Sequence, residues 1–275
     1  MRVSKAHACG NDFLVVDDNA ARGHNHVELA RTLCSRTTGV GADGVEFLTE
    51  TGQNEGRIVL HNADGSVAEI SGNGTRCVAA WIAHERGLGA GDTVLLRTDA
   101  GKRQCYIERR DGWIFQVTTG MGVPLMDRRR LILRDGLCVE GAVISMGNPH
   151  FVIFTDDPEF AVAGRRWEEI GREICFHPDF PRQTNVEFVR TLGPDRIVIR
   201  IFERGVGPTS SSGTGSSAAA AAAIALRGIP HSLRVQAPGG EQRVEWDGGS
   251  HELRLTGPAQ LILTADVFLD AGEGK

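Results

Sequence analysis

Residues 71–77 read Ser-Gly-Asn-Gly-Thr-Arg-Cys, and residues 212–217 read Ser-Gly-Thr-Gly-Ser-Ser. The two stretches lie 141 positions apart in a chain of 275 residues. The same offset aligns Val45-Glu46-Phe47 with Val186-Glu187-Phe188, and Arg86-Gly87 with Arg227-Gly228. Solenoid repeats are 20–50 residues long, whereas this repeat is half the chain. It therefore predicts two similar domains.

Both halves predict the same order of elements around the Gly-rich stretch. An apolar strand is expected at residues 57–61 and again at 198–202, each followed by a polar turn. The Gly-rich stretch then opens an Ala-rich helix, at 75–86 and at 216–227, which ends with Arg and a capping Gly. Because both helices are largely apolar, we expect each to be buried by the sheet of its own domain.

Composition excludes several classes of protein. Hydrophobic residues make up 41% and charged residues 24%, and the net charge of −5 gives little attraction for nucleic acid. No run of about 18 apolar residues and no signal-peptide core occurs, so we expect a cytoplasmic protein that does not act at a membrane. The basic run Arg128-Arg129-Arg130 is interpreted as a solvated face.

No metal site or disulfide framework is expected. The six cysteines are scattered without C-x-x-C pairs, which predicts reduced thiols. His24 and His26 form an H-x-H pair, but a polar turn explains them better than a metal site does.

The two Gly-rich helix starts form a candidate anion site. A helix N-terminus offers unpaired backbone N–H groups and about half a positive charge, and glycine allows a ligand to approach closely. We expect both starts to face one cleft and to bind a carboxylate or phosphate. Serine is also a favoured N-cap, which by itself would account for Ser71 and Ser212. Their equivalent positions in the two halves favour a functional role.

The sequence closely resembles diaminopimelate epimerase along nearly its whole length. The landmarks that carry the resemblance, in chain order, are Cys9-Gly10-Asn11-Asp12-Phe13, Gly39-Val40-Gly41-Ala42-Asp43-Gly44, His61-Asn62-Ala63-Asp64-Gly65-Ser66, residues 71–77, Met146-Gly147-Asn148-Pro149-His150, Thr184-Asn185-Val186-Glu187-Phe188 and Glu203-Arg204-Gly205-Val206-Gly207, running into Gly213-Thr214-Gly215. Any one of them is weak, but seven in order are specific.

The resemblance implies an α/β (α+β) fold. It has two pseudo-symmetric domains, each a β-barrel-like sheet around a central helix, usually in a homodimer. The expected domains are residues 1–114 with 264–275, and residues 115–263. The C-terminal strand, around 261–269, is expected to return to the first domain.

The resemblance also implies cofactor-independent interconversion of LL- and meso-diaminopimelate, in lysine and peptidoglycan precursor synthesis. In the family one cysteine removes the α-proton and another returns a proton to the opposite face. Here Ser71 and Ser212 occupy both positions. A free thiol has a pKa of about 8.5, whereas a serine hydroxyl is a far weaker acid. We therefore expect binding to survive and epimerisation to be slow.

By resemblance, the substrate-binding residues fall into three groups. Backbone amides at the two helix starts hold the reacting carboxylate, a guanidinium and three amides hold the distal carboxylate, and a carboxylate meets the distal ammonium. Asn11 is placed at the pocket edge. Asn at turns is often structural, and the Glu-Arg pair could lie on the surface. The residues at the reacting carboxylate are Gly72, Asn73, Gly213 and Thr214. Those at the distal carboxylate are Arg204, Asn62, Asn148 and Asn185, and the residue at the distal ammonium is Glu203.

Two other functions remain open. The first is a non-catalytic homologue that binds diaminopimelate or another amino acid without exchanging its α-proton. The second is a related isomerase or dehydratase of another small carboxylate, which would bind diaminopimelate weakly. No His is placed by sequence to activate either serine, although a distant one could fold nearby.

Overall fold

The computed structural model describes residues 1–68 and 70–269, which form two compact units. The first unit is Met1–Thr119 with the chain from Gly257 onward, and the second is Gly120–Thr256. The boundaries expected from the sequence, 114/115 and 263/264, lie a few residues from these. Residues 270–275 of the expected first domain lie outside the described residues.

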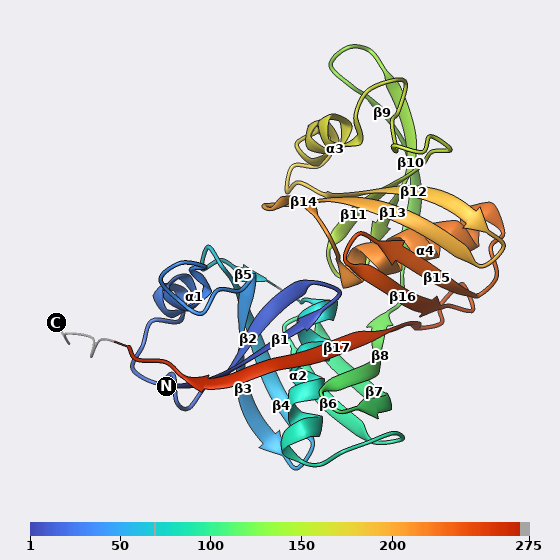
Figure 1. The fold of residues 1–275 in the computed structure, drawn as a ribbon. Helices are drawn as coiled ribbons and strands as arrows, with labels where there is room; N and C mark the ends of the chain where they lie inside the picture. Colours follow the sequence, from blue (N-terminus) through green and yellow to red (C-terminus); the bar gives the residue numbers. More distant parts are fainter. Residues whose placement is uncertain (69, 270–275) are drawn as a thin grey trace. The chain divides into compact units, whose positions relative to one another are not determined.

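The first unit is a closed barrel around a helix (Figure 1). Hydrogen-bonded pairs join eight strands in the cyclic order β17-β1-β2-β3-β4-β6-β7-β8-β17, with the short β5 beside β4. The strands are β1 (Arg2–Ala8), β2 (Asn11–Asp17), β3 (Gly44–Gly52), β4 (Glu55–Asn62), β5 (Val67–Ala68), β6 (Thr93–Thr98), β7 (Gly101–Asp111), β8 (Ile114–Gly122) and β17 (Leu253–Asp266).

Helix α2 (Gly72–Glu85) forms the core of this barrel. Its side chains Val78, Ala79, Ile82 and Ala83 pack in one apolar cluster with residues from β2, β3, β4, β6, β7, β8 and β17. Small residues let the strands approach the helix on all sides, so an Ala-rich sequence suits an enclosed helix. Helix α1 (His26–Cys34) packs on β3 and β4 through a separate cluster.

The second unit repeats this arrangement. Its sheet runs in the order β9-β10-β11-β12-β13-β15-β16-β17, with β14 beside β13. The elements are β9 (Leu125–Ile132), β10 (Cys138–Ser145), β11 (Pro149–Phe154), α3 (Trp167–Cys175), β12 (Asn185–Gly193), β13 (Arg196–Glu203), β14 (Gly207–Thr209), α4 (Gly213–Arg227), β15 (Ser232–Ala237) and β16 (Gly240–Glu245). Residues Ala218–Ala223 of α4 are completely buried in its core.

The duplication inferred from the sequence is visible in the element positions. The pairs α1 and α3, β3 and β12, β4 and β13, and α2 and α4 each begin 141 residues apart. The parallel pairings also match, because β2–β3 and β4–β6 in the first unit correspond to β11–β12 and β13–β15 in the second. The predicted fold class is therefore confirmed.

Local differences from the sequence prediction lie at the helix ends. Both central helices begin at their first glycine, three residues before the predicted starts. The predicted Gly cap is found at the end of α4, where Gly228 adopts φ 66°. In α2 the cap is Arg86, and Gly87 follows with φ 68°.

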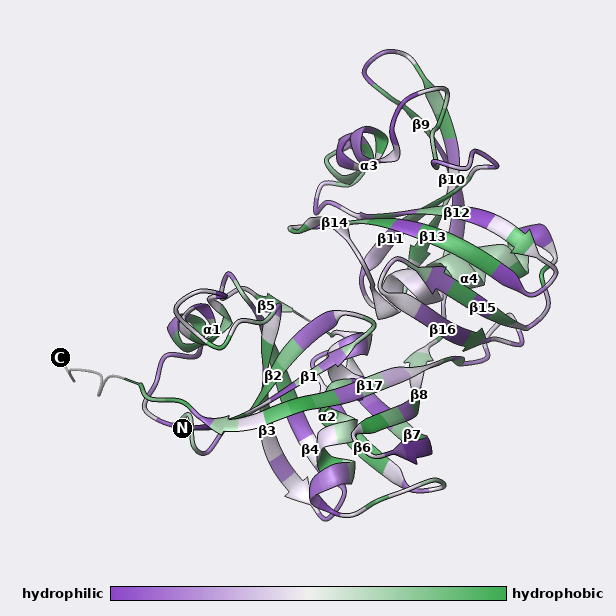
Figure 2. Ribbon diagram, in the orientation of Figure 1, coloured by the Kyte–Doolittle hydropathy of each residue, from purple (hydrophilic) through white to green (hydrophobic). Residues whose placement is uncertain are grey.

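The strands show the alternation expected of a sheet with one buried face. Buried and exposed residues alternate along β7 and β15. In Figure 2 strands of both units change between green and purple along their length. No helix within residues 1–68 and 70–269 is long and apolar enough to span a membrane.

Candidate functional site

Ser71 is the N-cap of α2. It has extended backbone angles, φ −123° and ψ 120°, and its Oγ accepts a hydrogen bond from the Gly74 amide at 3.0 Å. The carbonyl oxygen of Ser71 accepts a second bond from Thr75 N at 2.8 Å. The interpretation of Ser71 as a helix N-cap is therefore confirmed.

Ser212 caps α4 in the same way. Its Oγ accepts from the Gly215 amide at 3.1 Å, and its carbonyl accepts from Ser216 N at 2.9 Å. Its hydroxyl also lies 3.4 Å from Thr214 Oγ1. Each unit thus presents one serine hydroxyl at the positive end of a buried helix, where negative charge is stabilised.

A buried glutamate lies beneath each helix start. A Cβ on Gly215 would lie 2.8 Å from Glu187 Oε1, and a Cβ on Gly74 would overlap Glu46 Oε1. Glu46 pairs across the sheet with Val15 and Leu60. Gly74 and Gly215, the fourth residue of each Gly-rich stretch, must therefore be glycine because these carboxyl groups leave no room for a Cβ.

The glutamate of the second unit belongs to a hydrogen-bonded chain. Glu187 Oε1 lies 2.7 Å from His150 Nδ1, and both side chains are completely buried. His150 Nε2 lies 2.9 Å from Asn148 Oδ1, and Asn148 Nδ2 donates to Thr214 Oγ1 at 3.2 Å. Burial raises the pKa of Glu187, and the adjacent His150 opposes that rise.

The glutamate of the first unit has no such partner. Neither oxygen of Glu46 makes a hydrogen bond within the described part of the chain, and burial raises its pKa to about 8. His150 stands opposite Asn185 on β12, whereas Phe13 stands opposite Gly44 at the equivalent place on β3. The phenyl ring replaces the imidazole, so Glu46 stays unpaired.

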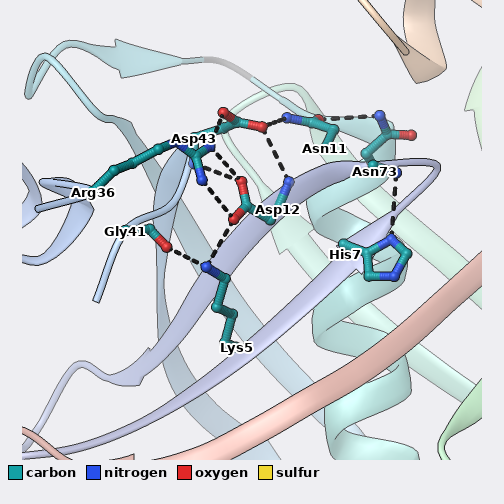
Figure 3. Close-up of polar contacts among 9 residues, drawn as sticks. Lys5, His7, Asn11, Asp12, Arg36, Gly41, Asp43 and Asn73 are labelled. Atoms are coloured by element: carbon teal, nitrogen blue, oxygen red, sulfur yellow. Dashed lines mark hydrogen bonds and ion pairs between the residues drawn. The ribbon is translucent and has the colours of Figure 1, made fainter. Parts of the chain in front are cut away.

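A buried arginine organises the start of α2. Arg76 is completely buried, and it donates to Gly72 O at 3.1 Å and to Asn73 Oδ1 at 2.6 Å. Burial lowers the pKa of Arg76 from its ordinary value. Asn73 Nδ2 in turn donates to Asn11 Oδ1 at 3.1 Å, so these two predicted site residues lie together (Figure 3).

Asn11 connects this helix start to a charged network that sequence reasoning missed. Asn11 Nδ2 donates to Asp43 Oδ2 at 2.6 Å, and Arg36 bridges Asp43 and Asp12 (Figure 3). Lys5 Nζ lies 3.0 Å from Asp12. Burial opposes ionisation of Asp12, but Arg36 and Lys5 hold its pKa below the ordinary value. The network stiffens the β1–β2 end that carries Asn11.

The residues predicted to hold the distal end of a ligand are found in two places. Asn62 ends β4, and its Nδ2 donates to Ser66 Oγ at 3.0 Å within a turn. Asn185 donates to Pro149 O at 3.1 Å and accepts from Arg204 N at 2.8 Å, so its amide holds the backbone of Arg204. The Arg204 side chain is exposed and donates to Arg182 O, and Glu203 ends β13.

Other predicted features have structural explanations. Residues 128–130 lie exposed on β9, where Arg130 pairs with Glu140. His26 stacks on Phe47 and lies 3.3 Å from Asp18. None of the six cysteines, all of which lie in the described residues, forms a disulfide bond. No cluster of His, Cys, Asp and Glu within residues 1–68 and 70–269 is arranged to hold a metal ion.

The sequence contained signals for the groups that were missed. The aligned Val-Glu-Phe triplets place a carboxyl inside a buried strand in each half, which is unusual unless the carboxyl has a role. His150 stood in the Gly-Asn-Pro-His landmark. Its contact with Glu187 joins two strands that are far apart in the chain, so only the fold reveals it.

Comparison with known proteins gives a consistent result. The sequence profile of a family described as diaminopimelate epimerase matches residues 3–126 and 142–262. The chain is 34% identical to the diaminopimelate epimerase of Desulfitobacterium hafniense, over 98% of this chain and 99% of that protein. It is 37% identical to that of Thermosynechococcus vestitus, over 94% and 96%.

Solved structures share the fold at low sequence identity. A hydroxyproline epimerase from Agrobacterium vitis superposes with a TM-score of 0.73 at 19% identity, covering 99% of this chain and 92% of that one. A PhzF-family phenazine biosynthesis protein from Bacillus anthracis gives 0.70 at 17% identity, covering 98% and 99%.

Proposed function

Because the chain belongs to the diaminopimelate epimerase family, we propose that it interconverts LL- and meso-diaminopimelate without a cofactor, slowly, with Ser71 and Ser212 as its two acid–base groups. The observation that supports this is the matched pair of helix starts, each with a serine Oγ bound to the third amide of its helix. Two-base chemistry needs one proton-handling group for each face of the α-carbon, and the repeated halves supply one each.

The substrate contacts follow from the same resemblance. We propose that the amides at Gly72, Asn73, Gly213 and Thr214 hold the reacting carboxylate, since helix N-termini favour anions. The distal carboxylate would meet Arg204, aided by Asn62 and Asn148, and the distal ammonium would meet Glu203. Asn185 would act through Arg204, because its amide oxygen accepts from the Arg204 backbone. Asn11 would act through Asn73, to which it is hydrogen-bonded.

Slow turnover follows from the acidity of the hydroxyl. An unassisted serine is almost wholly protonated at neutral pH, whereas a cysteine of pKa about 8.5 supplies a thiolate fraction. In the resting structure both hydroxyls also serve as helix caps. A hydroxyl engaged as a helix cap needs no catalytic role. The capping therefore favours one alternative, a homologue that binds diaminopimelate and does not turn it over.

Deuterium exchange tests the proposal. The protein is incubated with LL-diaminopimelate in deuterated water, and NMR follows loss of the α-hydrogen signal, with affinity measured by calorimetry. We expect binding with slow exchange, and exchange faster by about 10²-fold or more in the double variant Ser71→Cys/Ser212→Cys. Ser210→Cys, which adds a thiol at an exposed site, is the matched control.

The alternatives predict different results. Binding without exchange in the natural chain would support the binding homologue and contradict the enzyme. Absence of binding would contradict both, and would direct the search to other small carboxylates. A role in lysine and peptidoglycan precursor synthesis, a homodimer and a cytoplasmic location stay predictions, to be checked by complementation, light scattering and fractionation.

A further inference from the structure

Glu46 is a buried carboxyl group that packs under the first turn of α2. The residue is 1% exposed and is the third residue of β3. Neither carboxyl oxygen has a hydrogen-bond partner in residues 1–68 and 70–269. A buried polar group without a partner is destabilising, so a carboxyl kept here without compensation suggests a function.

The position of Glu46 relates it to Ser71. A Cβ built on Gly74 would overlap Glu46 Oε1 and would lie 3.3 Å from the Cβ of Ser71. The carboxyl and the serine therefore flank the same small space at the start of the helix. Ser71 Oγ accepts from the Gly74 amide, and no described contact uses its own hydrogen. A change of χ1 between staggered rotamers would redirect that hydroxyl.

The second unit shows that the fold does not require an unpaired glutamate beneath the helix start. At the equivalent position Glu187 is bonded to His150, and that pair lies within a chain leading to Thr214. In the first unit Phe13 occupies the equivalent place and offers no hydrogen bond. The two halves therefore differ in the polar groups beneath equivalent serine caps.

We propose that Glu46 is a positioning residue that exchanges a proton with the Ser71 hydroxyl during epimerisation. The inference rests on the proposed function. When Ser71 acts as the base, the α C–H bond breaks and its hydrogen forms a new O–H bond at Ser71. The original Ser71 hydroxyl proton passes to the Glu46 carboxylate, and the C–H electron pair stays on the α-carbon. In the reverse direction every transfer is reversed, so protons and charge balance.

The surroundings of Glu46 suit this exchange at mildly alkaline pH. Burial raises the pKa of Glu46 to about 8, close to working pH, where general-base efficiency is greatest. On β2 and β4 its direct neighbours, Val15 and Leu60, are apolar. Among the described residues, the ionisable groups that interact with this helix start include Arg76 and Cys77 on α2, Cys9 and Asp12 at the β1–β2 end, and Cys105 on β7.

The test compares Glu46→Gln with the natural chain in the deuterium-exchange assay. Glutamine keeps the size of the side chain and cannot accept the proton. We expect exchange to fall by about 10²-fold with the dissociation constant unchanged, and the rise in rate through pH 8 to disappear. Glu46→Asp should retain part of the rate and the pH dependence. Glu50→Gln, at the exposed end of the same strand, is the matched control.

A cysteine background shows whether Glu46 acts through the serine. In Ser71→Cys/Ser212→Cys the thiol forms its own thiolate, so adding Glu46→Gln should reduce exchange by less than about threefold. An equal loss in both backgrounds would indicate a merely structural role and overturn the inference. Unchanged exchange on Glu46→Gln in the serine background would overturn it as well, and would leave the proposed function intact.

A measurement without turnover separates the two proposals. Infrared difference spectra of the natural chain against Glu46→Gln isolate the carboxyl band of Glu46, which is titrated with pH. We expect a midpoint near 8 that rises by about 0.5 or more in Ser71→Ala, because a Ser71 hydroxyl turned towards Glu46 can donate to the ionised carboxylate and alanine cannot. A midpoint that Ser71→Ala leaves in place contradicts the inference even if the natural chain exchanges no deuterium.

Discussion

At the scale of single residues, the chemistry of each helix start depends on glycines that face buried carboxyl groups. Gly74 and Gly215 have no Cβ, and the space is taken by Glu46 and Glu187. In each half the capping serine, the glycine three residues after it and the buried glutamate therefore pack against one another. A substitution at any one of them changes the environment of the others.

The residue Gly74 gives a direct test of this packing. Gly74→Ala would place a methyl group against Glu46 Oε1 in a completely buried site, so we expect a loss of about 1–3 kcal/mol in the free energy of unfolding. Gly193→Ala, where an added Cβ meets nothing within 4 Å, is the matched control and should be nearly neutral. Urea titration of both variants measures the difference. Equal stabilities would show that Glu46 moves aside freely.

The charge state of Glu46 predicts a pH dependence of stability. Its pKa is raised to about 8 in the folded chain, so between its ordinary value near 4.5 and 8 the folded state binds more protons than the unfolded state. Its contribution to stability is therefore fully present below about pH 4.5 and is lost as the pH rises towards 8. Relative to Glu46→Gln, the natural chain should lose on the order of 1 kcal/mol per pH unit over this range. Parallel pH profiles of the unfolding midpoints would contradict this.

At the scale of elements, the two central helices begin with the same Ser-Gly-x-Gly pattern, but the buried glutamate beneath each start has different neighbours. Both start at a Ser-capped glycine and both are enclosed by their sheets. The strands beside them differ, since β11 contributes His150 where β2 contributes Phe13. The identity of one strand residue therefore decides whether the glutamate beneath the helix is paired.

His150 tests the paired arrangement. His150→Phe removes the partner of Glu187 and leaves a buried carboxyl alone, so we expect a loss of about 3–5 kcal/mol. The pKa of Glu187 should rise further, because His150 opposes the effect of burial. The double variant His150→Phe/Glu187→Leu removes both polar groups and should regain most of the stability, as measured by thermal unfolding. If the single and double variants were equally unstable, packing rather than the pair would be the cause.

At the scale of the whole molecule, the chain closes its first barrel with its last strand. The first half of β17 pairs with β16, and residues 260–266 pair with β1, so one strand serves both units. The barrel of the first unit therefore closes only after β17 has been made, and contacts of high sequence separation slow folding.

Truncation tests this closure. A chain that ends at Thr256 lacks the strand between β1 and β8, which leaves two open edges in the first unit. We expect amide protection in β1 and α2 to fall by 10-fold or more in hydrogen exchange, while protection in α4 changes little, because local opening follows lost contacts. Equal loss in α2 and α4 would indicate that the two units unfold as one.

Much of this architecture was predictable from the sequence. The repeat at 141 residues predicted the duplication, the Ala-rich runs predicted buried helices, and the landmarks predicted the family. Helix starts were predicted three residues late, because the Gly-rich stretch was interpreted as a loop before the helix. Glycine is a poor helix former, but the serine cap stabilises the first turn, and the carboxyl beneath that turn leaves no room for a Cβ.

The sequence by itself determined the duplicated fold and the family, since these depend on residue identity and on periodicity along the chain. Only the tertiary structure decided which buried carboxyl is paired. His150 and Glu187 come from different strands, and their hydrogen bond forms because a parallel pairing of β11 with β12 sets the register. These two strands are parallel and α3 lies between them in the chain, so no tight turn fixes which residues stand opposite each other.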